Sequence, residues 1–473
     1  MIVLTDKSNN PLYLQIYQQI KEKIISGQIA EDARLPSIRT LSDTLDVSKN
    51  TVIYAYEQLC SEGYVVNKTR SGFYTQKLNN EFFNLKNQNG FEQRILPLKS
   101  NDDERQHHTW SFNFQYGKLN PRDFPINLWR KLSNQLLSPV NLGKIVSYPD
   151  RKGEPGLREA IMKYLNISRG VCCRSEQIVI CSGTQTCLTL LCQLLKKDHS
   201  HMAIEDPGYD GARVVFINNG MNLIPIGLDK GGIRLDELEK SHAKLVYTTP
   251  SRQFPTGVVM PIQKRVKLLD WAARNSAVII EDDYDSELRY KGRPIPSIQS
   301  IDARGRVVYV GTFSKSLSPA LRLSYMVIPE SMMETYTRAF EKYNIFVPWL
   351  EQKIVGAFME AGHWERHLRK VRLANRKRHD VLIQTLDETM GDKVVVHGKN
   401  AGLHVILEFK NGLFEEELIK KANDHGVMVY PVSRYWIRRE LYANNMILLG
   451  FSGMDEHRIV EGVRILNRAW FNA

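Results

Sequence analysis

The sequence predicts an α/β protein in two unequal parts: a small winged helix-turn-helix at the N-terminus, and a larger α/β domain with a mainly parallel sheet. In residues 12–59, apolar side chains recur at helical spacing, and two short strand-like runs follow. From about residue 110, short β-branched apolar runs alternate with helical stretches, which is typical of a sheet covered on both faces. A length of 473 residues is enough for more than one core.

Three helices are predicted in the first sixty residues. Leu12, Ile16, Ile20 and Ile24 lie four residues apart and form one apolar stripe, and Gly27 ends that helix. Ser37 and Ser48 are suited to cap the second and third helices, because a serine oxygen accepts from the free N–H groups of a first turn. The apolar faces of these two helices consist of Ile38, Leu41 and Leu45, and of Val52, Ala55, Tyr56 and Leu59.

Residues 63–66 and 72–75 are predicted to form the two strands of a wing, joined by a turn that carries Arg70. In such modules the N-terminal end of the second helix of the pair enters the major groove of DNA. That end presents Ser48, Lys49, Asn50 and Thr51. Lys49 suits a phosphate or a guanine, Asn50 suits an adenine, and Arg39 and Arg70 are candidate phosphate contacts. The alternative is a winged helix that binds protein.

The distribution of charge is uneven. The net charge of +12 favours a nucleic-acid partner, yet residues 1–76 contain eight Lys or Arg and eight Asp or Glu. The basic excess lies further on, notably at Arg366, Arg369, Lys370, Arg372, Arg376, Lys377 and Arg378. Two interpretations of that run stay open: a solvated helix face, or an auxiliary surface that contacts phosphates.

Composition excludes other classes of protein. No apolar run approaches the ~20 residues of a membrane helix, and no secretory signal begins the chain, so the cytosol is expected. The six cysteines include no Cys-x-x-Cys pair, so we expect reduced thiols and no metal site. Residues 77–109 are rich in Asn, Gln and charge, which predicts a linker between residues 1–76 and a domain over 110–473.

The loops after the predicted strands of the large domain carry polar chemistry. The runs 178–180, 245–247, 277–280 and 307–310 are the predicted strands, and ligands bind at the carboxyl ends of such strands. Ser182, Gly183 and Thr184 open a helix whose free N–H groups suit a phosphate. Tyr209 follows a Pro-Gly turn and can stack on a planar ring. No Gly-x-Gly-x-x-Gly follows any strand, which argues against a dinucleotide fold.

Two later loops add a carboxylate and an amine. Asp282 and Tyr284 follow one strand, in a cluster of acidic residues, and Lys315 follows the next. A lysine near a phosphate and an aldehyde is what a Schiff base requires, and a carboxylate keeps a pyridine nitrogen protonated. Arg322, with Thr312 and Ser314, can bind the phosphate. These residue types together suit pyridoxal 5'-phosphate (PLP).

The order of these pieces is similar to that of fold-type I aminotransferases over about residues 110–470. The N-terminal part resembles the GntR-type domain in two segments, Leu35-Pro36-Ser37-Ile38-Arg39-Thr40-Leu41 and Val47-Ser48-Lys49-Asn50-Thr51-Val52. In that domain Arg is usual where Lys49 stands. The whole chain resembles the MocR/GabR-type regulators, a GntR-family winged helix fused to a fold-type I PLP-dependent aminotransferase-like domain with a smaller C-terminal α/β subdomain.

This resemblance implies a role for each candidate residue. Lys315 forms the Schiff base, Asp282 pairs with the ring nitrogen, Tyr284 holds the ring oxygen and Tyr209 stacks on the ring. The phosphate is held by Ser182, Gly183, Thr184, Thr312 and Arg322.

The resemblance also implies a cytoplasmic homodimer that binds double-stranded operator DNA and senses PLP, an amine or an amino acid through an aldimine. One departure concerns residues 447–451, where aminotransferases of this type carry an Arg for the substrate carboxylate and this chain has none. Arg434 is a candidate replacement that binds an effector. Efficient turnover is therefore not expected. The alternatives are an active aminotransferase with an accessory N-terminal domain and a sensor of PLP itself.

Overall fold

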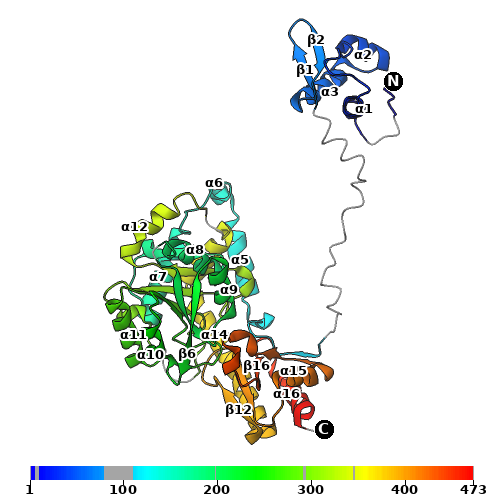
Figure 1. The fold of residues 1–473 in the computed structure, drawn as a ribbon. Helices are drawn as coiled ribbons and strands as arrows, with labels where there is room; N and C mark the ends of the chain where they lie inside the picture. Colours follow the sequence, from blue (N-terminus) through cyan, green and yellow to red (C-terminus); the bar gives the residue numbers. More distant parts are fainter. Residues whose placement is uncertain are drawn as a thin grey trace. The chain divides into compact units, whose positions relative to one another are not determined.

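The computed structural model describes residues 2–5, 10–78, 110–197, 199–290, 295–344 and 347–471. The chain separates into two units, Met1–His108 and Thr109–Ala473, and each is described by itself (Figure 1). The predicted linker lies outside the described residues from residue 79 to residue 109. No helix in the described ranges is long and apolar enough to cross a membrane.

The N-terminal unit is a winged helix-turn-helix. It contains α1 (Leu12–Ile25), α2 (Ile38–Leu45), α3 (Lys49–Ser61), β1 (Val65–Lys68) and β2 (Gly72–Thr75). The two strands pair antiparallel, with Val65 opposite Thr75. Ser37 accepts from the Thr40 N–H and Ser48 accepts from the Thr51 N–H, both at 3.1 Å, so both predicted caps are confirmed.

Tyr56 on α3 is the centre of the small core. Its side chain is fully buried among Ile16, Val52 and Leu59. The Tyr56 hydroxyl donates to the Pro36 carbonyl at 2.9 Å, and the ring meets Phe73 of the wing edge-on at 4.8 Å. One side chain thus joins the third helix to both the turn before α2 and the wing.

An eight-stranded sheet forms the large unit. Its order is β4-β11-β10-β9-β8-β5-β6-β7. The strands are β4 (Ile178–Cys181), β5 (His201–Asp206), β6 (Asn222–Asp229), β7 (Gly232–Ile233), β8 (Leu245–Thr248), β9 (Val278–Asp283), β10 (Val307–Thr312) and β11 (Ser324–Val327). The pairs from β10 through β6 are parallel, so the mainly parallel sheet is confirmed. β11 is antiparallel to both neighbours, and β7 is antiparallel to β6.

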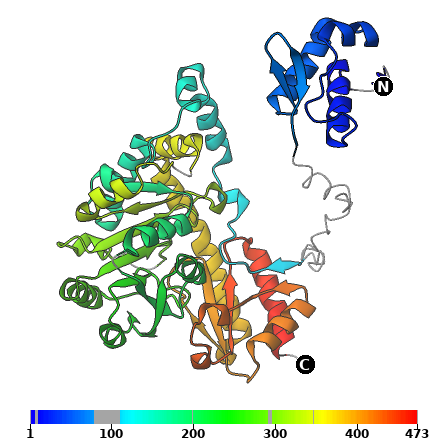
Figure 2. The ribbon, with the colours of Figure 1, turned by 45° about the horizontal axis from the view of Figure 1, so that its top comes forward.

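Helices cover both faces of this sheet (Figure 2). Along β4, Val179 and Cys181 pack in the core with α8 (Thr184–Leu195) and α9 (Asp210–Asn218), whereas Ile178 and Ile180 pack in the core with α7 (Pro155–Arg169) and α13 (Trp349–Glu360). This alternation is the period-two geometry of a strand buried on both sides. α10 (Leu235–Lys240) and α11 (Ile262–Arg274) pack further along the sheet. α5 (Ile126–Leu136) packs in the core with α7 and α13, α12 (Glu330–Ala339) packs in the core with α8 and α9, and α6 (Leu142–Ile145) is exposed.

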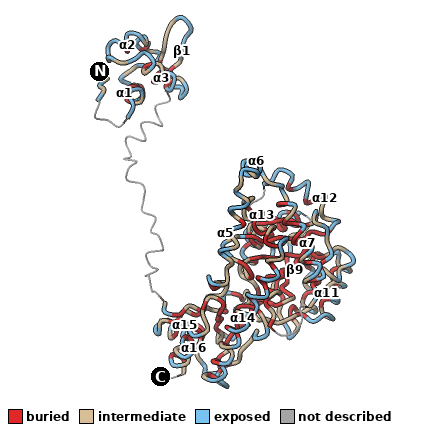
Figure 3. The backbone as a smooth tube through the Cα atoms, turned by 180° about the vertical axis from the view of Figure 1, so that it is seen from behind, coloured by how far each residue is buried: buried red, intermediate tan, exposed pale blue. Residues whose placement is uncertain are grey.

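The C-terminal part forms a smaller α/β subdomain, which follows the long helix α14 (His363–Thr389) (Figure 1). Its antiparallel sheet has the order β12-β13-β16-β15 and is packed against α14, α15 and α16. The elements are β12 (Val394–His397), β13 (His404–Phe409), α15 (Glu415–Asp424), β15 (Tyr430–Pro431), β16 (Met446–Gly450) and α16 (Glu456–Phe471). β14 (Val427–Met428) pairs with β3 (Phe112–Asn113). Buried residues concentrate in the interior of the large unit, between its sheets and the helices that cover them (Figure 3).

Candidate functional site

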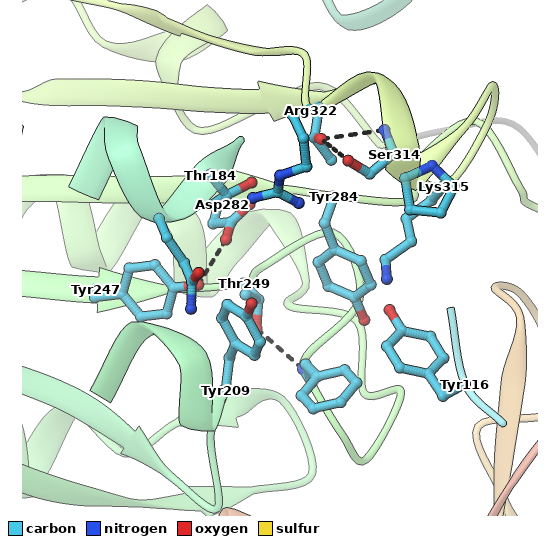
Figure 4. Close-up of a pocket in the computed structure, with 14 residues that line it drawn as sticks. Tyr116, Thr184, Tyr209, Tyr247, Thr249, Asp282, Tyr284, Ser314, Lys315 and Arg322 are labelled. Atoms are coloured by element: carbon cyan, nitrogen blue, oxygen red, sulfur yellow. Dashed lines mark hydrogen bonds between the residues drawn. The ribbon is translucent and has the colours of Figure 1, made fainter. Parts of the chain in front are cut away.

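A cavity of about 160 Å³ lies at the carboxyl ends of β8, β9 and β10. Figure 4 shows its lining. The cavity brings together the predicted residues Thr184, Tyr209, Asp282, Tyr284, Thr312, Ser314, Lys315 and Arg322. It also contains Tyr116, Tyr247, Thr249 and Phe254, which sequence reasoning did not assign to the site.

Lys315 stands in the loop after β10 and is partly buried, with its side chain in the cavity. The Nζ atom lies 4.1 Å from the centre of the Tyr116 ring. Burial lowers the pKa of Lys315 to about 8, although Asp285 and Asp282 oppose that shift. About one tenth of this amine is therefore neutral, and nucleophilic, at pH 7, far more than for a lysine of ordinary pKa.

Asp282, near the end of β9, faces the same cavity with one oxygen satisfied and one free. Its Oδ2 accepts from the Tyr247 hydroxyl at 2.6 Å, while Oδ1 is buried without a partner in the described structure. Burial raises the pKa of Asp282 to about 7, and the charges of Asp283 and Asp285 act in the same direction. A buried acceptor without a donor is costly, so this oxygen is suited to receive an N–H from a ligand.

The opposite end of the cavity is suited to an anion. Thr184 begins α8, and the N-cap before it is Gly183 at φ 85°. A Cβ atom at Gly183 would overlap the Arg322 guanidinium, so this close approach requires glycine. Helix N-termini and arginine both favour phosphate. Ser182 precedes this turn, and its carbonyl accepts from the Thr186 hydroxyl; neither Ser182 nor Gly183 is among the residues that line the cavity.

The hydroxyl groups beside this end lie at the end of β10 and in the loop that carries Lys315. Thr312 Oγ1 accepts from the Ser314 N–H at 3.1 Å and from the Ser324 hydroxyl at 2.8 Å, and it donates to Ser314 Oγ at 3.0 Å. Ser314 and Thr312 thus face the cavity from a hydrogen-bonded turn, next to Arg322.

Arg252, which sequence reasoning missed, supports Tyr284 from behind. Its side chain is buried and donates to the Tyr284 hydroxyl at 3.4 Å and to Asp285 at 3.2 Å. A second nitrogen donates to the His404 carbonyl on β13 at 2.8 Å. The only sequence signal was an arginine in the loop after a strand. This side chain links the cavity wall to the C-terminal subdomain.

Arg434 lies in a short 3-10 helix and does not line the cavity. Its Nε donates to Asp210 at 2.7 Å, and its side chain remains 54% exposed. The late strand β16 presents buried Leu448 opposite Tyr430 and Ile406. An effector role for Arg434 therefore stays a prediction, and a carboxylate would compete with Asp210 for its guanidinium.

The candidate DNA contacts lie on the surface of the N-terminal unit. Ser48, Lys49 and Asn50 are exposed at the start of α3. Ser48 and Thr51 are hydrogen-bonded to each other at 2.8 Å in the cap, which leaves Lys49 and Asn50 to face outward. Arg70 lies at the turn between β1 and β2 with φ 63°.

Arg39 on α2 is the remaining candidate in this unit. Its side chain is 83% exposed, and its Nε lies 4.0 Å from a carboxylate oxygen of Asp43, which is also exposed. A surface pair at this distance contributes little to stability, so Arg39 is available to a phosphate.

Comparison with known proteins agrees with both parts of this architecture. The family model described as "Bacterial regulatory proteins, gntR family" matches residues 12–75, and "Aminotransferase class I and II" matches residues 120–444. The chain is 40% identical to the uncharacterized HTH-type transcriptional regulator YhdI of Bacillus subtilis, over 99% of this chain and 97% of that protein. It is 30% identical to the probable rhizopine catabolism regulatory protein MocR of Rhizobium meliloti, over 99% and 96%.

Solved structures match the large unit. One is the multiple substrate aminotransferase from Thermococcus profundus, with a TM-score of 0.70 and 27% identity, covering 79% of this chain and 95% of that one. Fold and site thus define a helix-turn-helix transcriptional regulator with an aminotransferase-like domain. The chain belongs to the GntR family of regulators, in its MocR/GabR-type branch, whose second domain has the fold-type I aminotransferase architecture.

Proposed function

We propose that the cavity at Lys315 binds PLP and that the bound cofactor, or an amine captured by it, controls how the regulator binds its operator. The aminotransferase class I and II fold generally binds PLP. The single observation that carries the proposal is the juxtaposition of the buried lysine amine with the unpartnered Asp282 Oδ1 in one cavity. These two groups match the aldehyde and the pyridine nitrogen of PLP, respectively.

Different residues of the cavity would hold different parts of PLP. Gly183, Thr184, Thr312, Ser314 and Arg322 would bind the phosphate. Ser182 and Gly183 are not among the residues that line the cavity, so they would contribute through the turn that opens α8. Tyr209 would stack on the ring, and Tyr284, oriented by Arg252, would hold the ring oxygen.

PLP supplies an aldehyde that combines with primary amines and a ring that withdraws electrons. The chain's own residues prepare that chemistry. Burial keeps part of the Lys315 amine neutral at neutral pH, and Tyr247 holds Asp282 through Oδ2, which leaves Oδ1 without a partner among the described residues. The missing arginine on β16 leaves a substrate carboxylate without its usual bidentate partner. Poor orientation then makes rapid turnover unfavourable. We therefore favour a sensor over an aminotransferase.

The effector is a primary amine, an amino acid or PLP itself. An amino acid would be favoured if its carboxylate displaced Asp210 from Arg434. PLP alone would be favoured if no amine changed the complex. Both outcomes belong to the same regulator class, whereas an active aminotransferase is the rival from another class.

We propose further that the protein acts as a homodimer. The support is a run of apolar side chains that a monomer exposes to water: Val140 is 92% exposed, Val146 83% and Tyr148 86%. Apolar surface that gathers in this way marks an interaction site. Sedimentation should give twice the mass of the 54.5 kDa chain.

Binding assays should distinguish phosphate contacts from base contacts in the winged helix. Removing Arg39 or Arg70 should weaken binding on every duplex and reduce the salt slope by about one per phosphate contact. Asn50→Ala should cost about 1–3 kcal/mol on the operator alone, because only a base contact carries sequence information. Fluorescence anisotropy with operator and scrambled duplexes measures both. Equal losses for Asn50→Ala on the two duplexes would remove Asn50 from base recognition.

Cofactor capture should depend on pH through Lys315. Only the neutral amine reacts, and burial lowers the pKa of Lys315 to about 8. The rate of PLP capture by the cofactor-free protein should therefore rise about tenfold per pH unit below that value and level off above it. Dividing by the rate of PLP with a simple amine of ordinary pKa, about 10.4, removes the cofactor's own titration. Below about pH 8 this ratio should stay constant, because the neutral fractions of both amines rise together, and above pH 8 it should fall about tenfold per pH unit. A ratio that stays constant above pH 8 as well would contradict the lowered pKa of Lys315.

A further inference from the structure

The outer face of α14 carries positive charge that the site at Lys315 does not use. Arg366, Arg369, Lys370, Arg372, Arg376 and Lys377 are all exposed, whereas Trp364, Leu368, Val371 and Leu382 of the same helix are buried. At 3.6 residues per turn, the six cations fall within roughly 160° of the helix surface and span about 17 Å along its axis. We call these six residues the α14 basic face.

The basic face does not stabilise its own helix. Arg366 and Lys370, and likewise Arg372 and Arg376, repeat the same charge at a spacing of four residues, which weakens a helix. Arg366, in the first turn, also opposes the helix dipole. Arg376 is paired with an acidic residue, Asp380, at 3.6 Å. Along residues 365–380, Glu365 and Asp380 are the exposed acidic side chains on the same side of the helix, against six cations. A solvated helix normally intersperses acidic and basic side chains more evenly, so the excess of cations is better explained by a partner.

Half of these cations are free to make new contacts. Arg366 donates to the Gly362 and Ala361 carbonyls, and Arg372 donates to the Glu287 carbonyl at 2.8 Å. Arg369, Lys370 and Lys377 have no hydrogen bond or ion pair to any other described residue. The seventh cation of the run, Arg378, differs because it turns inward to Asp123 at 2.6 Å.

We propose that the α14 basic face is a second DNA-binding surface that contacts phosphates without reading sequence. The proposal rests on the operator binding proposed above. Residues 1–76 carry as many acidic as basic side chains, so the winged helix supplies no net charge against a polyanion. Duplex DNA carries one negative charge per about 1.7 Å, so the length of the face matches on the order of ten phosphate charges. Phosphate contacts position a protein on DNA but carry no sequence information.

The test replaces Arg369, Lys370 and Lys377 together by Gln in the full-length protein. The matched control replaces Lys240, Lys267 and Lys420 by Gln. These lysines are exposed on α10, α11 and α15, and their replacement removes the same amount of positive charge. Binding to operator and scrambled duplexes of equal length is measured over a range of salt concentrations. Because glutamine is a good helix former, thermal unfolding of both variants should match that of the native protein.

The α14 variant should lose about tenfold to a hundredfold in affinity near physiological salt, equally on both duplexes. Its salt slope should fall by about two to three, since each phosphate contact contributes about 0.9. The control should keep the native slope. Lys377→Gln alone should lower the salt slope by about one. This single variant checks that the change in slope comes from a lost phosphate contact and not from the combined disturbance of three substitutions.

Identical slopes for the α14 variant and the control would overturn the proposal. Unchanged DNA binding with reduced transcription in a purified system would also overturn it, because the face would then contact an acidic protein. These outcomes leave operator binding by the winged helix intact. Failure of operator binding itself would appear differently, as native protein that does not distinguish operator from scrambled duplex.

Discussion

Lys315→Ala is expected to abolish covalent attachment of PLP and the visible absorption that accompanies it. Lys315 is the lysine among the residues that line the cavity, and its Nζ faces the Tyr116 ring inside it (Figure 4). Without this amine the aldehyde has no partner on the protein. Phosphate contacts alone would leave only reversible binding.

The measurement is the absorbance spectrum of protein incubated with PLP and then desalted. Lys267→Ala, a change of an exposed lysine on α11, is the matched control and should keep the native spectrum. Reduction with borohydride followed by peptide mapping should place the label on Lys315. An undiminished band in Lys315→Ala would contradict the cofactor assignment. The same variant should bind operator with an affinity that no longer responds to PLP or amines.

Tyr56→Ala should unfold the winged helix and eliminate operator binding. The side chain is fully buried, so truncation leaves a cavity that costs about 3–5 kcal/mol, and it also removes the hydroxyl that donates to Pro36. A unit of this size has little stability to spare. The large unit has separate cores, so its spectrum with PLP should be unchanged.

Tyr56→Phe separates the two contributions. It keeps the ring against Phe73 and loses only the hydrogen bond, so it should cost about 1 kcal/mol and retain DNA binding. Thermal unfolding followed by circular dichroism and operator binding check both variants. Operator binding of native strength in Tyr56→Ala would show that the winged helix is not the principal DNA reader.

Much of this fold follows from local sequence patterns. The strands β4, β8, β9 and β10 were predicted because β-branched runs are continuous where a strand is buried on both faces. The caps at Ser37 and Ser48 are equally local. The antiparallel strand β11 was not predicted, because its position between β4 and β10 depends on the packing of the whole sheet.

The candidate site likewise contains residues that the sequence predicted and residues that only the structure shows. Asp282 and Lys315 were found because each lies at or after the end of a predicted strand, where ligands bind in such sheets. Tyr116 and Arg252 approach the cavity from distant parts of the chain, and no spacing reveals that. Nor does sequence show that Asp210 pairs with Arg434, since 224 residues separate them.

The most direct test of the central claim combines spectroscopy, product analysis and operator binding on one preparation. The PLP-loaded protein is mixed with a panel of amines and amino acids and with 2-oxoglutarate, while absorbance, keto-acid formation and operator affinity are followed together. We predict a spectral change with an effector, a matching change in operator affinity and little keto acid; if no amine acts, operator affinity should follow PLP itself. Multiple turnovers at roughly one per second or faster, with operator affinity unaffected by PLP or any amine, would contradict the sensor and identify an aminotransferase.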